Sequence, residues 1–206
     1  METLKQSAFF FFLLLSITGW SQNSETVQQK AYSVSYLAEY KQDYNAAIQA
    51  VKSVYQENAY EDNLRLGWLN YLLGNFSASQ TYYTKAVNLK PASVEARLGL
   101  IKPLSSLESW DFVLKQYQEI LKLDPGSYAA NYWSGVIHYN RKQYEVSVKF
   151  FEKIVNYYPF DYDAAHMLAW NYYFMSKTNE ARIMFNKALL IRPGDSSAIQ
   201  GLSLLK

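Results

Sequence analysis

Two histidines and two aspartates are the residues of this chain whose types and positions could support metal or proton-transfer chemistry. His138 and His166 fall in the first helical segments of successive units, and Asp161 and Asp163 precede the second of these segments. Their spacing matches no ligand motif, and a metal site needs several converging ligands. Asp161 is better placed to cap the following helix, with Asp163 stabilising its first turn. The sequence therefore predicts no metal site.

The chain contains none of the short motifs that mark common catalytic or phosphate-binding sites. It has no glycine-rich phosphate loop, nucleophile elbow or HExxH sequence. Its serines stand in no context that would activate a hydroxyl nucleophile. The absence of cysteine excludes disulfides and thiolate metal ligands. We therefore expect a protein that is not an enzyme and that needs no cofactor.

Regular spacing of proline organises most of the chain. Four of its five prolines follow one another at intervals of 34 residues, at positions Pro91, Pro125, Pro159 and Pro193. A fixed period of this length is typical of repeat arrays. Upstream of the prolines the apolar residues follow a helical period rather than the period of two expected for strands. The pattern predicts units of two amphipathic helices, each ending near a proline, which lacks an amide hydrogen.

Small and bulky residues recur at fixed positions within the units. Small residues at the eighth and twentieth positions let the two helices approach closely, and bulky residues at the seventeenth and twenty-fourth fill the gap between them. The small set comprises Ser35, Gly67, Gly135 and Ala169 in the first helices and Ala47, Ser79, Ser147 and Ala181 in the second. The bulky set comprises Phe76, Tyr83, Trp110, Tyr117, Tyr144 and Phe151. The residues placed to cap the following helices are Ser93, Ser127, Asp161 and Asp195.

This pattern resembles the tetratricopeptide-repeat family. The resemblance covers about five units from roughly Gln28 to Pro193, and it implies an all-α solenoid of helix-turn-helix repeats. Within a repeat domain over residues 22–206, we place the units at 28–59, 60–93, 94–127, 128–161 and 162–195. A short terminal helix over 196–205 is expected to cap the open end of the stack. No linker or charge run marks a second domain.

Two units depart from the pattern. The first has Ala59 where proline is expected, and it is shorter than the period. The third has Ile101 and Val113 at its two small positions, and it holds Pro103 inside its first helix. A proline there removes one hydrogen bond and should bend the helix. Later residues of this unit, including Pro125, stay in phase, so we interpret it as a repeat as well.

Residues 1–21 have the composition of a secretory signal peptide. Lys5 is followed by an apolar run from Ala8 to Ile17 and then by small residues up to Ser21. This run of about ten residues is well short of the roughly 20 needed to span a bilayer. We expect cleavage after Ser21, with an uncleaved anchor as the alternative. The lack of cysteine excludes a lipoprotein anchor, and an exported repeat protein without disulfides best fits a bacterial periplasm or cell surface.

The charge balance argues against a strongly charged partner. Lysine and arginine number 20 against 18 aspartate and glutamate residues, which gives a formal net charge of +2. This field is too weak to indicate binding to nucleic acid or to an anionic membrane. After removal of the leader we expect no stable membrane insertion.

In the family that the sequence resembles, the first helices of successive units line a concave face and usually carry the ligand. Here the inward positions form an aromatic groove with few charges. The predicted partner-binding residues are Leu64, Trp68, Tyr71, Lys102, Tyr132, Tyr139, Asn140, His166, Trp170, Tyr173 and Phe174. Large amphipathic rings suit the binding of a peptide. Packing within the array is the alternative use of these rings, above all for Tyr71, Tyr139 and Tyr173.

The groove supports more than one reading. The favoured reading is an interaction module, a scaffold or adaptor that holds a peptide or protein partner of unknown identity. A second reading is a glycan-binding module with tryptophan and tyrosine as stacking platforms, although such sites also need polar side chains around the rings. Self-association through exposed aromatic residues is a third. The lysine and asparagine set with which one subtype of the family grips an acidic C-terminus is absent.

Overall fold

The computed structural model describes residues 26–205, and in this range it contains eleven α-helices and no β-strand. The first helices of successive pairs are α1 (Val27–Tyr40), α3 (Tyr60–Leu72), α5 (Val94–Ser106), α7 (Tyr128–Asn140) and α9 (Tyr162–Phe174). The second helices are α2 (Tyr44–Lys52), α4 (Phe76–Leu89), α6 (Trp110–Leu123), α8 (Tyr144–Tyr157) and α10 (Thr178–Ile191). A last helix, α11 (Ser196–Leu204), follows them.

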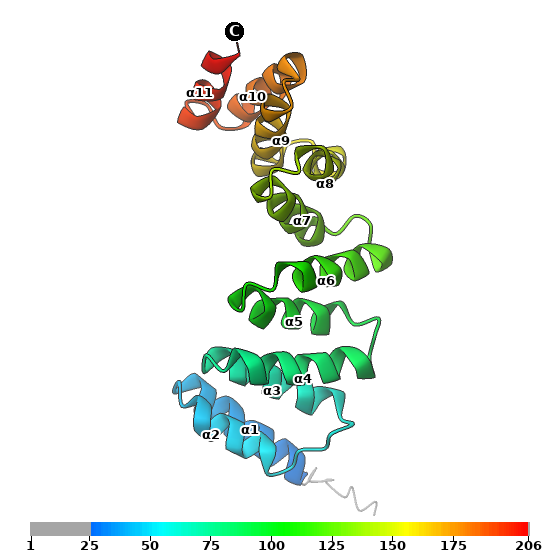
Figure 1. Ribbon diagram of the computed structural model, residues 1–206. Helices are drawn as coiled ribbons and strands as arrows, with labels where there is room; N and C mark the ends of the chain where they lie inside the picture. The colour runs from blue at the N-terminus through cyan, green and yellow to red at the C-terminus, as the bar shows by residue number, and fades with distance from the viewer. Residues whose placement is uncertain (1–25, 206) are drawn as a thin grey trace, which may run out of the picture.

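The helices stack in chain order into one curved array (Figure 1). Consecutive helices pack against each other, and α3 also contacts α5. The last helix, α11, lies against both α10 and α9 at the end of the stack. The predicted α-solenoid of five helix pairs with a terminal capping helix is therefore confirmed.

Helices within a pair approach closely because small residues face large rings. A β-carbon at Gly135 on α7 would stand 2.7 Å from the ring of Phe151 on α8. Gly67 has the same relationship to Tyr83, at 2.8 Å. The small residues predicted at the eighth and twentieth positions are all buried. Packing at these positions therefore follows the sequence pattern.

Two of the buried small residues are serines that hydrogen-bond across their pair. Ser79 Oγ donates to the carbonyl oxygen of Gly67 at 2.7 Å, and Ser147 Oγ donates to that of Gly135 at 2.8 Å. A buried hydroxyl costs free energy unless it is hydrogen-bonded. Each serine therefore fits a position that alanine fills in other units.

The turn inside each pair places one residue in the left-handed backbone region. These residues are Gln42, Gly74, Glu108, Lys142 and Ser176, with φ between 54° and 80°. A positive φ strains residues other than glycine by about 1–2 kcal/mol. Only Gly74 meets this geometry without strain, so the other four turns carry a local cost that the packing of the array outweighs.

Most of the predicted helix caps are confirmed. Ser93, Asp161 and Asp195 each accept a hydrogen bond from the backbone amide three residues later, at distances from 2.7 to 3.1 Å. Ser127 also precedes its helix, but its hydroxyl makes no capping hydrogen bond, so that part of the prediction is wrong. Pro103 lies inside α5, which continues to Ser106.

The first unit lacks its proline, and a buried aspartate on α3 connects this unit to the second by hydrogen bonds. The Asp62 carboxylate accepts hydrogen bonds from Tyr32 Oη at 2.6 Å, from Gln28 Nε2 at 3.3 Å and from the Gln56 amide at 2.8 Å. Burial and this carboxylate raise the pKa of Tyr32, so its hydroxyl stays a donor. The loop before α3 is thus fastened to α1 by polar contacts. At the same register the later units have Ala96, Ala130, Ala164 and Ala198.

The predicted leader over residues 1–21 lies outside the described residues. Within residues 26–205, no helix combines the length and the apolar character needed to cross a membrane.

Candidate functional site

Predicted site residues of the second and third units line one hollow between α1, α3 and α5. Leu64 and Trp68 come from α3 and Lys102 from α5, and the hollow has a volume of about 900 Å³. Leu98, one turn before Lys102, also lines it. Three first helices thus build a common surface, as the repeat register predicts.

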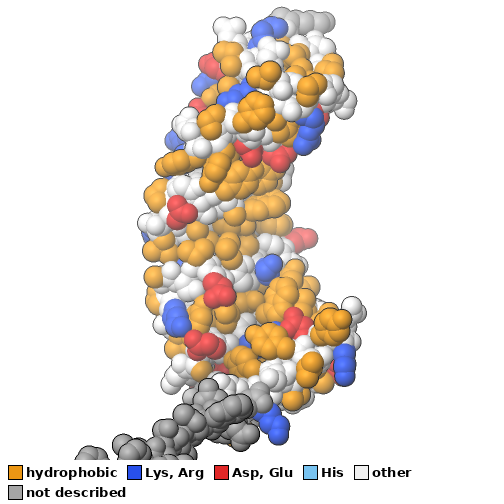
Figure 2. Space-filling model, turned by 180° about the vertical axis from the view of Figure 1, so that it is seen from behind, with side chains coloured by type: hydrophobic (Ala, Val, Ile, Leu, Met, Phe, Trp, Pro, Cys, Tyr) orange, Lys and Arg blue, Asp and Glu red, His pale blue; other side chains and the backbone are white. Residues whose placement is uncertain are grey.

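A second hollow, of about 640 Å³, continues from the first toward α7. Leu98 and Lys102 line both hollows, and the second also reaches Tyr71 on α3, Tyr117 on α6 and Trp133 on α7. We call the two joined hollows the inner groove. Figure 2 shows a face of the molecule along which apolar side chains form a band, with charged side chains scattered over it.

Trp68 is held in place from α1. Its indole Nε1 donates to Glu39 Oε1 at 2.7 Å, and the other carboxylate oxygen of Glu39 forms an ion pair with Arg65. Arg65 also donates to Ser35 Oγ at 3.0 Å, and its guanidinium lies 3.9 Å from the ring centroid of Tyr36. Both charges beside Trp68 are therefore satisfied within the protein.

Lys102 is an exposed cation in the inner groove. Its Nζ lies 5.5 Å from the ring centroid of Trp68 and 5.8 Å from that of Tyr71. Among residues 26–205 no carboxylate forms an ion pair with it. An ammonium over aromatic faces keeps its charge available to a second partner.

The predicted residues of the fifth unit pack mainly among themselves. The Trp170 ring meets the edge of Phe185 at 5.1 Å and that of Tyr173 at 5.4 Å. Its Nε1 donates to His166 Nε2 and to Ser197 Oγ, both at 3.1 Å. These contacts tie α9 to α10 and α11. Burial lowers the pKa of His166, which favours the neutral ring, and Nε2 of that ring accepts the Trp170 hydrogen bond.

Tyr132 and Tyr139 also contact other rings of the array. Tyr132 lies edge-on to Phe151 at 5.8 Å, while Tyr139 meets Tyr144 at 5.7 Å and Phe174 at 6.0 Å. Phe174 lines a separate hollow near the C-terminal end. A binding role for these rings stays a prediction.

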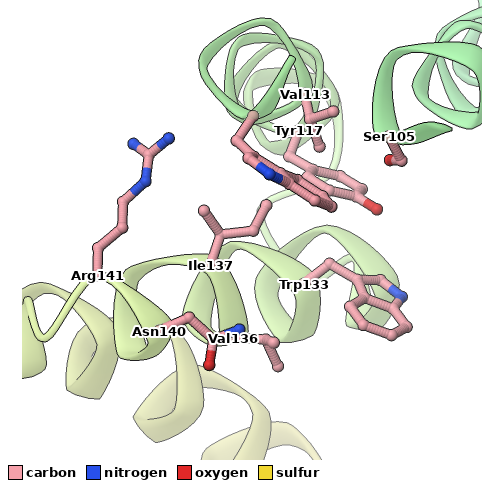
Figure 3. A pocket seen from close by; sticks show the side chains of 9 residues that line it. Ser105, Val113, Tyr117, Trp133, Val136, Ile137, Asn140 and Arg141 are labelled. Carbon is pink, nitrogen blue, oxygen red and sulfur yellow. The ribbon is translucent and has the colours of Figure 1, made fainter. Parts of the chain in front are cut away.

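A further hollow, between the third and fourth units, was not expected from the register. We call it the notch. It has a volume of about 490 Å³ and is lined mainly by Trp110, Val113, Tyr117, Trp133, Val136 and Ile137. Figure 3 shows Val113 and Tyr117 entering from α6 and Val136 and Ile137 from α7.

Two residues for which the sequence predicted other positions, Trp110 and Asn140, line the notch. Trp110 was expected to fill the gap between helices, but it is 41% exposed and lines the notch instead. Asn140, a predicted site residue, also lines the notch. Trp133 was missed because its register position had no assigned role. The sequence feature that could have drawn attention to Trp133 is Gly99, the much smaller residue at the equivalent position one period earlier.

Asp161, Asp163 and His166 lie at the start of α9 and within its first turns, whereas His138 lies on α7. His138 Nδ1 is 2.6 Å from Gln143 Oε1, whereas His166 Nε2 is 2.8 Å from Ser197 Oγ on α11. Asp161 caps α9, as predicted. Within the part of the chain that the structure describes, no group of three or more His, Asp or Glu side chains is placed to hold a metal.

Family models identify tetratricopeptide repeats in the chain. One tetratricopeptide-repeat model matches residues 129–161, and another matches residues 63–93 and 162–195. These ranges are the second, fourth and fifth helix pairs, while the first and third, whose sequences depart from the pattern, also fold as helix pairs. The chain therefore contains tetratricopeptide repeats. Such repeats generally serve protein interaction, and their presence supports a role as an interaction scaffold.

Solved structures share the fold. A crystal structure of MamA protein has a TM-score of 0.70 at 22% identity and covers 80% of this chain and 91% of its own. A tetratricopeptide-repeat protein from Parabacteroides merdae has a TM-score of 0.72 at 18% identity, with 87% and 72% covered. MamA from Desulfovibrio magneticus has a TM-score of 0.67 at 18% identity, with 82% and 98% covered. At these identities the likeness shows the fold alone. No curated protein matches the sequence.

Proposed function

We propose that this chain is an exported scaffold that holds a peptide segment of a partner protein in the inner groove. The observation that carries the proposal is the continuity of the groove across α1, α3, α5 and α7. Repeat arrays bind their partners on extended surfaces to which successive units contribute. Export to a bacterial periplasm or cell surface is the part of the proposal that rests on the leader sequence.

The lining of the groove favours a peptide over a sugar. Leu64, Leu98, Trp68 and Tyr71 supply apolar and aromatic surface, and Lys102 supplies an exposed charge. The carboxylate and guanidinium groups beside the indole are already paired with each other. A sugar-stacking site would need further free hydrogen-bonding side chains around the rings, whereas apolar peptide side chains need only the surface itself.

Site-specific photo-crosslinking in cells tests the proposal. A photoreactive benzoylphenylalanine at Leu98, which is 38% exposed in the groove, should crosslink one defined partner protein. A matched probe at Leu190, which is 71% exposed on α10 and lines none of these hollows, should not crosslink that protein. Leu98→Asp should reduce co-purification of the partner, and Leu190→Asp should leave it unchanged.

Equal crosslinking from Leu98 and Leu190 would contradict a specific groove. A crosslink from Leu98 to a second copy of this chain would replace the peptide reading with self-association. If Leu98 gives no protein product and the purified chain binds a glycan array, the sugar-binding reading replaces it.

A further inference from the structure

Trp133, which lines the notch, stands at the register where the third unit and the terminal helix have glycine. Gly99 lies one period before Trp133, and Gly201 lies two periods after it. A β-carbon at either glycine would lie 2.2 Å from an aromatic ring of the preceding unit, so those units pack that closely only without a side chain. Trp133 lines the same hollows as Tyr117, the corresponding ring of the third unit. The packing of α7 on α6 is accordingly more open than that of α5 on α4.

The walls of the notch are apolar and partly uncovered. Trp110 is 41% exposed and Trp133 is 50% exposed, while Val113, Tyr117 and Ile137 are buried beneath them. Large exposed rings beside a hollow mark an interaction site rather than a solvated surface. The volume of about 490 Å³ lies within the range of about 300–1,000 Å³ typical of ligand sites. It can therefore receive a large side chain.

Charge complementarity indicates what accompanies that side chain. The notch and the second hollow of the inner groove share Tyr117 and Trp133, and their charged lining residues are Lys102 and Arg141. Arg141 is paired with Asp111 at 2.9 Å. No carboxylate among residues 26–205 pairs with Lys102. The unmatched charge of these two hollows is thus positive and complements an acidic group, whereas Glu95, which lines the first hollow, accepts a hydrogen bond from Tyr60 Oη at 3.1 Å.

We propose that the notch binds one bulky apolar side chain, such as Phe, Trp or Leu, of a partner segment with an acidic residue close by for Lys102. This inference rests on the proposed function, because it names the chemistry of the peptide that the groove holds. The notch selects the apolar anchor, and Lys102 selects the charge beside it.

Fluorine NMR of the full chain labelled with fluorotryptophan tests the proposal residue by residue. Each resonance is assigned by a single Trp→Phe substitution. The probes are acetylated, amidated peptides with one Glu and one Phe separated by glycine spacers of increasing length, and matched peptides with Gln in place of Glu. We expect the Glu peptides to shift the resonances of Trp110 and Trp133 and to leave that of Trp170 unmoved.

Variants separate the contributions of the ring and the charge. Trp133→Ala should weaken binding by about tenfold, because it removes a wall of the notch. Lys102→Gln should weaken binding of the Glu peptides by about two- to fivefold and leave the Gln peptides unchanged. Phe112→Ala is the matched control, since Phe112 is an exposed ring on the same helix as Trp110 but lines neither the notch nor the inner groove.

Unmoved resonances of Trp110 and Trp133 in every peptide up to about 5 mM, which corresponds to negligible affinity, would overturn the inference. A shift of Trp68 alone would place the peptide in the inner groove and reject the notch while the proposed function stands. Equal binding of Glu and Gln peptides would reject the role of Lys102. The resonances of Trp110 and Trp133 could also shift with protein concentration when no peptide is present. This result would show that a second copy of the chain occupies the notch, and it would overturn the inference.

Discussion

The ring of Phe151 fills the space that a β-carbon on Gly135 would need, with 2.7 Å between the ring and that position. Gly135→Ala should force α7 and α8 apart and lower the free energy of unfolding by about 1–3 kcal/mol. Urea denaturation measures this loss. Combined with Phe151→Leu, the loss should be smaller than the sum of the two single losses, because both substitutions act on one contact. Strict additivity would show that the close approach is not the cause.

Lys142 offers a stabilising substitution. Its φ of 59° lies in the left-handed region, and the side chain is exposed. Lys142→Gly should raise the free energy of unfolding by about 0.5–1 kcal/mol, because relief of the strain exceeds the entropy that glycine adds to the unfolded chain. Gly74→Ala, at the equivalent turn with φ of 80°, should do the reverse. The midpoints of urea denaturation compare the two variants, and a less stable Lys142→Gly protein would contradict the argument.

We expect the protein to be destabilised when Asp62 is replaced by alanine, the residue that later units have at this register. Asp62→Ala would leave Tyr32 Oη and the Gln56 amide without their carboxylate acceptor. We expect a loss of about 1–2 kcal/mol, because two partly buried donors lose their acceptor. Hydrogen exchange should place the loss in α1, α2 and the start of α3. Unchanged protection there would mean that the first unit does not depend on this carboxylate.

Trp170 and Trp133 should differ sharply in their contribution to stability. Trp170 packs on Phe185 and hydrogen-bonds to α11, so Trp170→Ala should cost about 2–4 kcal/mol. Trp133 is 50% exposed, so Trp133→Ala should cost about 1 kcal/mol or less. Thermal and urea denaturation of both variants provide the comparison. Equal losses would mean that Trp133 is a packing residue and not a wall kept open to solvent.

His166 should make stability depend on mild acid. Burial lowers its pKa, outweighing the opposite effect of Asp195 and Asp163, and its Nε2 accepts the Trp170 indole hydrogen. The unfolded chain therefore takes up the proton first, near about pH 6.5, and stability falls from there toward the lower folded-state pKa. Urea midpoints measured at about pH 7.5 and about pH 5.5 should converge in the His166→Gln variant. A full pH dependence retained in that variant would assign the effect to other groups.

The helix pairs could be predicted from the sequence because every unit repeats the same local packing. Gly135 and Ser147 meet across one pair as Gly67 and Ser79 do across another, so the pattern carries the geometry. The first unit lacks the proline and is instead joined to the second unit by hydrogen bonds to the Asp62 carboxylate. The buried Asp62 at the start of the second unit, to which the first unit is hydrogen-bonded, is replaced by alanine at this register in the later units, so the repeat pattern gives no sign of it.

The candidate site was less predictable, because a register assigns a side chain to a face but not to the contacts it makes there. Trp170 stands at an inward position, yet Ser197 of the last helix accepts its indole hydrogen. Lys102 and Trp68 meet across units as the register suggests. The sequence alone gives no reason to single out Trp133. Its position becomes informative only when the structure shows how closely an aromatic ring approaches Gly99 and Gly201 at the same register.

The position of Trp133 between α6 and α7 also bears on how the array unfolds. In a linear stack each interface adds its own coupling energy, and cooperativity passes along the chain only where that coupling is strong. The packing between α6 and α7 is sparser than that between α4 and α5 and equals that between α2 and α3, so we expect the helices from α1 to α6 and those from α7 to α11 to unfold as two partly independent blocks. A single melting temperature then averages two transitions, one reported by Trp68 and Trp110 and the other by Trp133 and Trp170.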